Sequence, residues 1–318
     1  PEDDASSVPN VVPSMNKLIE GQKVAAVMGA ISNPHYYAAR TVAESAGVPF
    51  VSWATPMAVG REEAVLKYCF TTSQDAVEKG VAVLEIIKHL GAKNVFAAAD
   101  LEPTYTDSLK YAQAEAEKLG IKFTLLPDTW DNTQADYSAV IQKLYANYQS
   151  LSPDLMVVLA VPTDTPPILK GLHDLGVECP VVMDGVNAMP IALFANGTDP
   201  VQGTLFPSPG CLDPYAVPDG TPGKELWTKF YDGFKAKSGD APSLPTCFGY
   251  DGWLVLQEGL KAGGSDREKI RDGIEALKDF QGMQTRFSYS AEDHMGAYGG
   301  FFLWEVVGDQ FKFVAPLG

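Results

Sequence analysis

Residues 24–56, VAAVMGAISNPHYYAARTVAESAGVPFVSWATP, decide the predicted fold of this chain. An apolar run ends at Gly29 and predicts a strand. The Ser-Asn-Pro sequence at 32–34 predicts a helix start, because Asn is a favoured N-cap and Pro a favoured first helical residue. The helix is expected to end at Gly47, since glycine is a common C-terminal stop, and a second apolar strand follows over residues 48–53. The segment therefore predicts two parallel strands joined by a helix.

Both predicted strands end in loops of small and polar residues. In open α/β sheets, ligands bind outside the carboxyl ends of the strands. The N-terminus of a helix attracts anions such as carboxylates. The segment therefore predicts a site for a small anion or zwitterion, built from backbone groups and hydroxyls rather than from catalytic side chains.

Length and charge limit the class of protein. The chain has 318 residues, which favours two lobes over one. Its formal net charge of −16 disfavours nucleic acids and anionic membranes as partners, because both select for Lys and Arg. No apolar run reaches the roughly 18 residues of a transmembrane helix. The sequence opens with PEDD and carries no signal peptide, which is compatible with a processed or truncated start.

Nothing in the sequence predicts catalysis, a cofactor or a metal. It contains no Gly-x-Ser-x-Gly elbow and no glycine-rich phosphate loop, and its acidic residues form no metal-binding series. The four histidines are scattered, and we expect His89 and His173 on the surface. The sequence therefore favours a binding protein over an enzyme.

The cysteines lie outside any Cys-x-x-Cys motif, and no histidine stands at zinc spacing from them. Free buried thiols are the simplest interpretation of Cys69 and Cys179. Cys211 and Cys247 flank one segment and could pair in an oxidising compartment. The sequence leaves the disulfide state of all four open.

Strands and helices alternate along most of the chain, the pattern of a parallel sheet covered on both faces. The first predicted element is a helix over residues 11–20, so the first lobe lacks an opening strand. Residues 210–224 read as a loop, and three helices follow it. The end of the chain changes character, because residues 285–290, 300–306 and 310–314 predict antiparallel strands.

The loops at the predicted strand ends carry hydroxyl, aromatic and carboxylate side chains, which is the composition of a binding cleft. The candidate ligand-binding residues are Ser32, Asn33, Trp53, Ala54, Thr55, Tyr105, Thr163, Asp184 and Tyr250.

Five segments together resemble one family. They are LIEGQKVAAVMGAISNPHYYAARTVAESAGVPFVSWATP, NVFAAADLEPTYTDSLKYAQAEAEKLG, DYSAVIQKLYANYQSLSPDLMVVLAV, PVVMDG and CFGYDGWLVLQEGLKA. The chain resembles the periplasmic solute-binding proteins of ABC importers, specifically the branched-chain amino-acid (leucine/isoleucine/valine) binding family with type I lobes. The resemblance implies an α/β fold of two doubly wound lobes with parallel central sheets, joined by a three-strand hinge. Lobe 1 would comprise residues 1–72 and 210–284, and lobe 2 residues 73–209 and 285–318.

The resemblance also implies roles for several candidates. Ser32 would hold the ligand carboxylate and ammonium together with the Ala54 carbonyl and the Thr55 hydroxyl. Tyr105 and Tyr250 would supply aromatic contacts, and Asp184 would meet the ammonium. The loop after Leu159 reads Val-Pro-Thr-Asp where the family often has an aromatic residue, which argues against simply naming leucine.

The expected function is therefore that of a non-enzymatic receptor. It would clamp a small amino acid or related carboxylate between its lobes and deliver it to an ABC transporter permease. It would act as a monomer, in the periplasm or anchored outside the cytoplasmic membrane. The alternatives are a ligand-sensing regulatory domain of the same fold that binds an aromatic or aliphatic carboxylate, and an enzyme of doubly wound fold. The sequence leaves open the ligand's side chain and whether it needs an amine.

Overall fold

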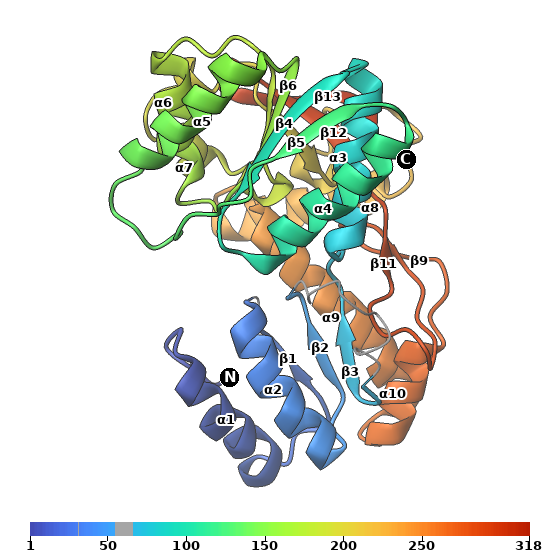
Figure 1. Cartoon of the computed structure of the whole chain (residues 1–318). Coiled ribbons are helices and arrows are strands. Elements are labelled where there is room, and N and C mark those ends of the chain that lie inside the picture. The colour runs from blue at the N-terminus through green and yellow to red at the C-terminus, as the bar shows by residue number, and fades with distance from the viewer. Residues whose placement is uncertain (31, 55–65) are drawn as a thin grey trace. The chain divides into compact units, whose positions relative to one another are not determined.

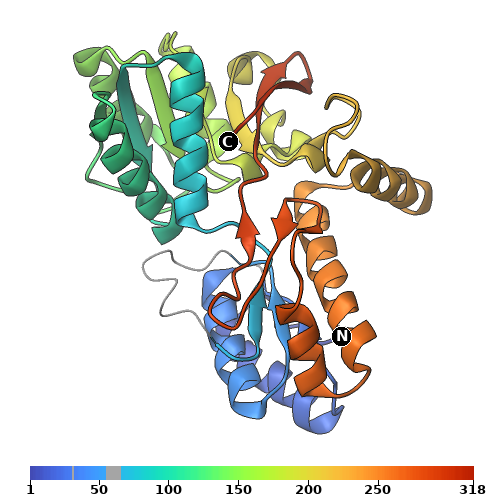
Figure 2. The same cartoon turned by 90° about the vertical axis from the view of Figure 1, so that its right-hand side faces the viewer.

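The computed structural model of the chain describes residues 1–30, 32–54 and 66–318, drawn in Figures 1 and 2. These residues form two compact units. Unit 1 comprises Pro1–Asp75 and Pro245–Tyr298, and unit 2 comprises Ala76–Leu244 and Gly299–Gly318. Each unit is an α/β structure with its own sheet and helices, as the sequence predicts for each lobe.

The division of the chain differs from the expected lobes at three places, the first being a shift of the first boundary from residue 72 to residue 75. Residues 210–244 belong to unit 2, because the Trp227 ring covers Gly210 and meets the Phe302 ring edge-on at 6.0 Å. Residues 285–298 belong to unit 1, where the predicted antiparallel strand is much shorter than expected. There, β10 (Arg286–Phe287) pairs antiparallel with both β9 (Phe280–Gln281) and β11 (Ala297–Tyr298).

The main sheet of unit 1 has three parallel strands in the order β1-β2-β3, namely β1 (Val27–Met28), β2 (Phe50–Ser52) and β3 (Cys69–Thr71). The helices of this unit are α1 (Val8–Asn16), a π-helix (Lys17–Gly21), α2 (Asn33–Ala46), α9 (Leu244–Gly263) and α10 (Arg267–Glu275). Strand β1 is shorter than the predicted run, because only its last two residues pair with β2.

Both faces of this sheet are covered, because successive strand residues point to opposite sides. Phe50 packs into a core with Met15 of α1 and Tyr36 of α2. Its neighbour Val51 packs into a second core with residues of α9 and α10 such as Val255. Figure 1 shows α1 and α2 side by side next to the three strands, and Figure 2 shows α9 and α10 in orange.

Helix α2 begins and ends close to its predicted bounds. The N-cap residue is Ser32 rather than Asn33, and Pro34 occupies the first turn, where its missing N–H costs no hydrogen bond. Gly47 follows the helix with φ 60°, the left-handed conformation that glycine adopts without strain. Helix α2 thus begins at Asn33, shortly after β1 ends at Met28.

The sheet of unit 2 has seven strands in the order β13-β12-β8-β7-β6-β4-β5. The five from β8 to β5 are parallel, and β12 and β13 join antiparallel, as the changed pattern at the end of the chain predicts. The strands are β4 (Asn94–Ala99), β5 (Lys122–Leu125), β6 (Leu155–Leu159), β7 (Val181–Val182), β8 (Leu205–Ser208), β12 (Phe302–Val307) and β13 (Gln310–Pro316).

The helices of unit 2 cover both faces of this sheet, and Figure 1 shows α3 and α4 on one side with α5 and α6 on the other. Alternate residues of β4 and β6, such as Val95 and Val157, form one core with α3 and α4. The helices are α3 (Ala76–Leu90), α4 (Pro103–Lys118), α5 (Ser138–Leu151), α6 (Thr165–Asp174), α7 (Pro190–Leu193) and α8 (Lys224–Ser238).

All four cysteines are free thiols, so the pair considered for Cys211 and Cys247 is not formed. His89 and His173 lie on the surface, as predicted. Among the described helices, none combines the length and the apolar character that crossing a membrane requires.

Candidate functional site

In unit 1, the candidate residues lie where the parallel strands end. Ser32 is the N-cap of α2, yet its side chain caps no backbone N–H. Its Oγ lies 2.5 Å from His35 Nδ1, and His35 Nε2 lies 3.9 Å from Asp4 Oδ2. Asn33 is the first residue of α2. The N-terminus of α2, with its positive dipole end, therefore carries a hydroxyl that contacts the His35 side chain of the first helical turn rather than a backbone N–H of the helix.

Trp53 and Ala54 follow β2. Ala54 is buried, and its backbone N–H donates a hydrogen bond to Ser52 Oγ. The Trp53 carbonyl accepts a hydrogen bond from Ser73 Oγ at 2.7 Å. A Cβ on Gly252 of α9 would lie 3.2 Å from Trp53 Cε3. The Trp53 ring thus packs against the backbone of the helix that also carries Tyr250, which is half-buried. Thr55 lies outside the described residues.

In unit 2, Asp184 follows the carboxyl end of β7 and is buried. Its Oδ1 accepts a hydrogen bond from Val186 N at 3.0 Å, which caps a short 3₁₀-helix (Gly185–Asn187). Its Oδ2 lies 2.9 Å from Lys79 Nζ in the first turn of α3. The carboxylate is therefore engaged by protein donors on both oxygens.

Tyr105, in the first turn of α4, lies beside the same pair. Lys79 Nζ stands 5.2 Å from the centre of the Tyr105 ring, within range of a cation–π interaction. Burial, and then the nearby Asp184 carboxylate, raise the pKa of Tyr105 well above its usual value. Lys79 therefore links Tyr105 and Asp184, two of the predicted site residues.

Thr163, in the loop after β6, donates its hydroxyl to Asp164 Oδ1. Asp164 is fully buried and also accepts from Trp130 Nε1 at 2.9 Å and from the Tyr137 hydroxyl at 2.6 Å. Thr163 thus belongs to a network that holds its loop. Thr163 lies at the same edge of the sheet as Asp184, because the carboxyl ends of parallel strands lie on the same side.

Asp100, directly after β4, lies at this edge as well. It accepts from the backbone N–H groups of Glu102 and Val161 at 2.7 and 2.9 Å. Burial raises the pKa of Asp100 to about 6, against these two hydrogen bonds, which act to lower it. The carboxyl ends of β4, β6 and β7 therefore form one polar edge.

The predictions from the sequence missed Lys79. The local sequence does not reveal its partner, since Asp184 lies 105 positions further along the chain. Its unusual feature is a lysine in the first turn of a helix, where the helix dipole disfavours a cation. The candidates themselves fall into two groups, with Ser32, Asn33, Trp53, Ala54 and Tyr250 in unit 1 and Tyr105, Thr163 and Asp184 in unit 2.

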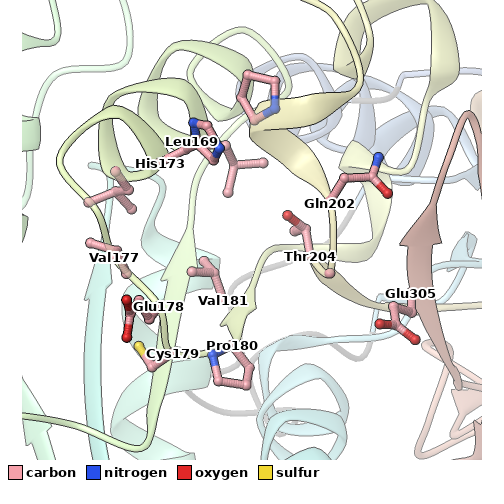
Figure 3. A pocket seen from close by; sticks show the side chains of 13 residues that line it. Leu169, His173, Val177, Glu178, Cys179, Pro180, Val181, Gln202, Thr204 and Glu305 are labelled. Atoms are coloured by element: carbon pink, nitrogen blue, oxygen red, sulfur yellow. The ribbon is translucent and has the colours of Figure 1, made fainter.

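A pocket of about 280 Å³ lies elsewhere in unit 2 (Figure 3). Val181 and Thr204 line it at the amino-terminal ends of β7 and β8, opposite to the edge that carries Asp184. Glu178 and Glu305 also line it. In the described part of the chain, no group of three His, Cys, Asp or Glu side chains could hold a metal ion there or elsewhere.

The fold and the polar strand ends define a ligand-binding protein of two α/β units. A sequence profile of the periplasmic binding protein family matches residues 1–310. The chain belongs to this family, whose members are non-enzymatic receptors that bind small-molecule ligands and work with ABC transporters. Family membership indicates an extracytoplasmic location.

Individual relatives are distant. A curated "amino acid binding protein" from Pseudomonas aeruginosa is 24% identical over 280 residues, which is 86% of this chain and 70% of the relative. An extracellular ligand-binding receptor from Rhodopseudomonas palustris HaA2 superposes with a TM-score of 0.84 at 21% identity, covering 98% of this chain and 88% of that one.

A branched-chain amino acid transporter substrate binding protein from Streptococcus pneumoniae, solved with isoleucine, has a TM-score of 0.79 at 19% identity. The match covers 99% of this chain and 86% of that one. These structures confirm the predicted type I periplasmic binding fold.

Proposed function

We propose that this chain is the receptor of an ABC importer and binds a small amino acid or related carboxylate at the carboxyl ends of its parallel strands. It would take up the ligand outside the cytoplasm, as a monomer, and deliver it to a membrane permease. Clamping of the ligand by residues of both units is part of this proposal. The family membership of the chain supports the receptor role.

The start of α2 carries the carboxylate part of the proposal. A helix N-terminus offers N–H groups without partners inside the helix and a positive dipole end. Ser32 stands there with a hydroxyl that does not cap the helix. A carboxylate at this position would accept charge-assisted hydrogen bonds, which are about twice as strong as neutral ones.

The relatives support the size and class of the ligand. The curated relative from Pseudomonas aeruginosa is an amino acid binding protein, and the Streptococcus pneumoniae structure contains isoleucine. Amino acids, isoleucine among them, are small molecules that carry a carboxylate. The permease as destination rests on the family alone, and a ligand-sensing domain of the same fold is the alternative.

A thermal-shift screen tests the proposal. The protein is heated with α-amino acids and with small aromatic and aliphatic carboxylates, each at several concentrations. A ligand at 100 times its Kd adds about 2.7 kcal/mol of stability, which gives a clear shift in Tm. A concentration-dependent shift with a carboxylate is the expected result. No shift with any member of either series would overturn the proposed ligand class.

A further inference from the structure

We propose that Lys79 occupies the position at Asp184 where a ligand ammonium would bind, so that the ligand of this protein is an organic acid without an α-amine. The inference rests on the proposed function, because it concerns the same site. It names the ligand class that the sequence left open.

Both Asp184 oxygens already have protein donors. Oδ1 accepts from the backbone N–H of Val186, and Oδ2 accepts from Lys79 Nζ at 2.9 Å. A ligand ammonium that took the Lys79 position would have to displace Lys79. The sequence-based expectation that Asp184 meets an ammonium is therefore satisfied by the protein itself.

Burial makes the displacement costly. The Asp184 side chain is 6% exposed and that of Lys79 is 20% exposed. Removing one member of a buried ion pair leaves an uncompensated charge. Lys79 therefore stays on Asp184 when the ligand binds.

Lys79 can still contact a ligand. An ammonium carries three N–H donors. One direction is used by Asp184 and another faces the Tyr105 ring, 5.2 Å from its centre. The remaining donor and the exposed fifth of the side chain are available to an acceptor. A ligand carboxylate or other anionic oxygen fits this donor.

Two other carboxylates at this edge, Asp100 and Asp164, do not replace Asp184 as ammonium receptors. Asp100 is fully buried and bonded to two backbone N–H groups. Asp164 is fully buried and accepts from Trp130, Tyr137 and Thr163. Both carboxylates hold loops in place, so neither offers a ligand the exposed charge that an ammonium needs.

Charge balance gives the same ligand class. A zwitterionic amino acid brings one positive and one negative group to a site with a free carboxylate. Here the protein supplies the positive group through Lys79. An acid with a single negative group therefore gives the occupied site the same total charge. An α-amino acid would place a second cation beside a carboxylate that is already neutralised.

Calorimetric titration with matched ligand pairs tests this assignment. The pairs are leucine with 4-methylpentanoate and phenylalanine with 3-phenylpropanoate, which differ only in the α-amine. In at least one pair, we expect the amine-free acid to bind at least about tenfold tighter than its amino acid. A tenfold ratio of the two Kd values corresponds to about 1.4 kcal/mol of binding free energy.

Variants then separate the role of Lys79 from general damage. Lys79→Met removes the charge and frees Asp184, so the preference should shift toward the amino acid by roughly tenfold or more. Lys79→Arg keeps the charge and should keep the preference for the acid. Lys88→Met is the matched control, because Lys88 lies on the same helix in an exposed pair with Glu85.

The outcomes separate the two proposals. If the wild type binds an amino acid tighter than its amine-free partner, or if Lys79→Met leaves the ratio unchanged, the role of Lys79 is wrong and the receptor function stands. If Lys79→Met fails to fold, the ratio of the two affinities in the wild type and in Lys79→Arg still tests the role of Lys79. If no carboxylate of any kind binds the wild type, both proposals fail together.

Discussion

His294 stacks on Phe70 with the ring centres 4.0 Å apart, and its two ring nitrogens face the Cys69 carbonyl and the Glu275 carboxylate. The distances are 3.1 Å to the Cys69 oxygen and 3.0 Å to Glu275 Oε1. One buried side chain thus joins β3 to α10 in unit 1. None of its partners is near it in sequence, since they lie 225 and 19 positions away.

Replacing His294 by Ala should destabilise unit 1 by about 2–4 kcal/mol, because the change opens a cavity and leaves the Cys69 carbonyl without its partner. Urea unfolding followed by circular dichroism measures the loss. His89→Ala is the control, because His89 is exposed and its removal should change stability by less than about 0.5 kcal/mol. Equal effects of the two substitutions would contradict a structural role for His294.

The carboxyl group of Asp251 predicts a dependence of stability on pH. It is fully buried and accepts from the backbone N–H groups of Met283 and Gln284. Burial raises its pKa to about 7, against these hydrogen bonds. Between the unfolded pKa of about 3.9 and the folded pKa, the folded state keeps a proton that the unfolded state has released. The stabilisation from Asp251 is therefore complete below about pH 4 and falls as the pH rises toward 7.

Comparing wild type with Asp251→Asn isolates this contribution, since the variant cannot titrate at this position. Relative to the variant, the unfolding free energy of the wild type should be largest at about pH 4 and below, and it should fall as the pH rises toward 7. An advantage that stays constant over this range would show that Asp251 is ionised throughout.

Gly185 supports the position of Asp184. A Cβ at Gly185 would lie 1.9 Å from the Pro207 carbonyl oxygen, so even alanine forces the loop after β7 away from β8. Gly185→Ala should cost about 2–4 kcal/mol of stability and weaken ligand binding. Gly233→Ala in α8 is the matched control, because nothing lies within 4 Å of its Cβ position. That change should be neutral or stabilise by up to about 1 kcal/mol.

Ser32 is the first residue of the proposed carboxylate site. Ser32→Ala should reduce ligand affinity by about 1–2 kcal/mol, or roughly five- to thirtyfold, because one hydrogen bond to a charged group is lost. Calorimetric titration measures the change. Ser45→Ala, at an exposed position near the end of the same helix, should leave the affinity unaltered. Unchanged affinity in Ser32→Ala would remove Ser32 from the site.

The order of the elements could be predicted because its signals are local. Glycines at 47, 91 and 120 end predicted helices, and each adopts a positive φ that other residues rarely tolerate. The apolar run at residues 155–159 forms the fully buried strand β6 expected for a central parallel strand.

The rest depends on contacts between distant residues. The assignment of residues 210–244 to unit 2 follows from the packing of Trp227 on Phe302, which no local pattern announces. The same is true of Lys79, whose partner is known only once α3 and β7 are placed. The candidate residues could be named from their strand ends, but their hydrogen-bond partners could not.

The structure of the protein with a bound carboxylate tests the central claim most directly. A crystal grown with the best ligand from the thermal-shift screen should show one carboxylate oxygen within about 3 Å of Ser32 Oγ, at the N-terminus of α2. A ligand held in the pocket of Figure 3 instead, or far from the carboxyl ends of the strands, would contradict the account.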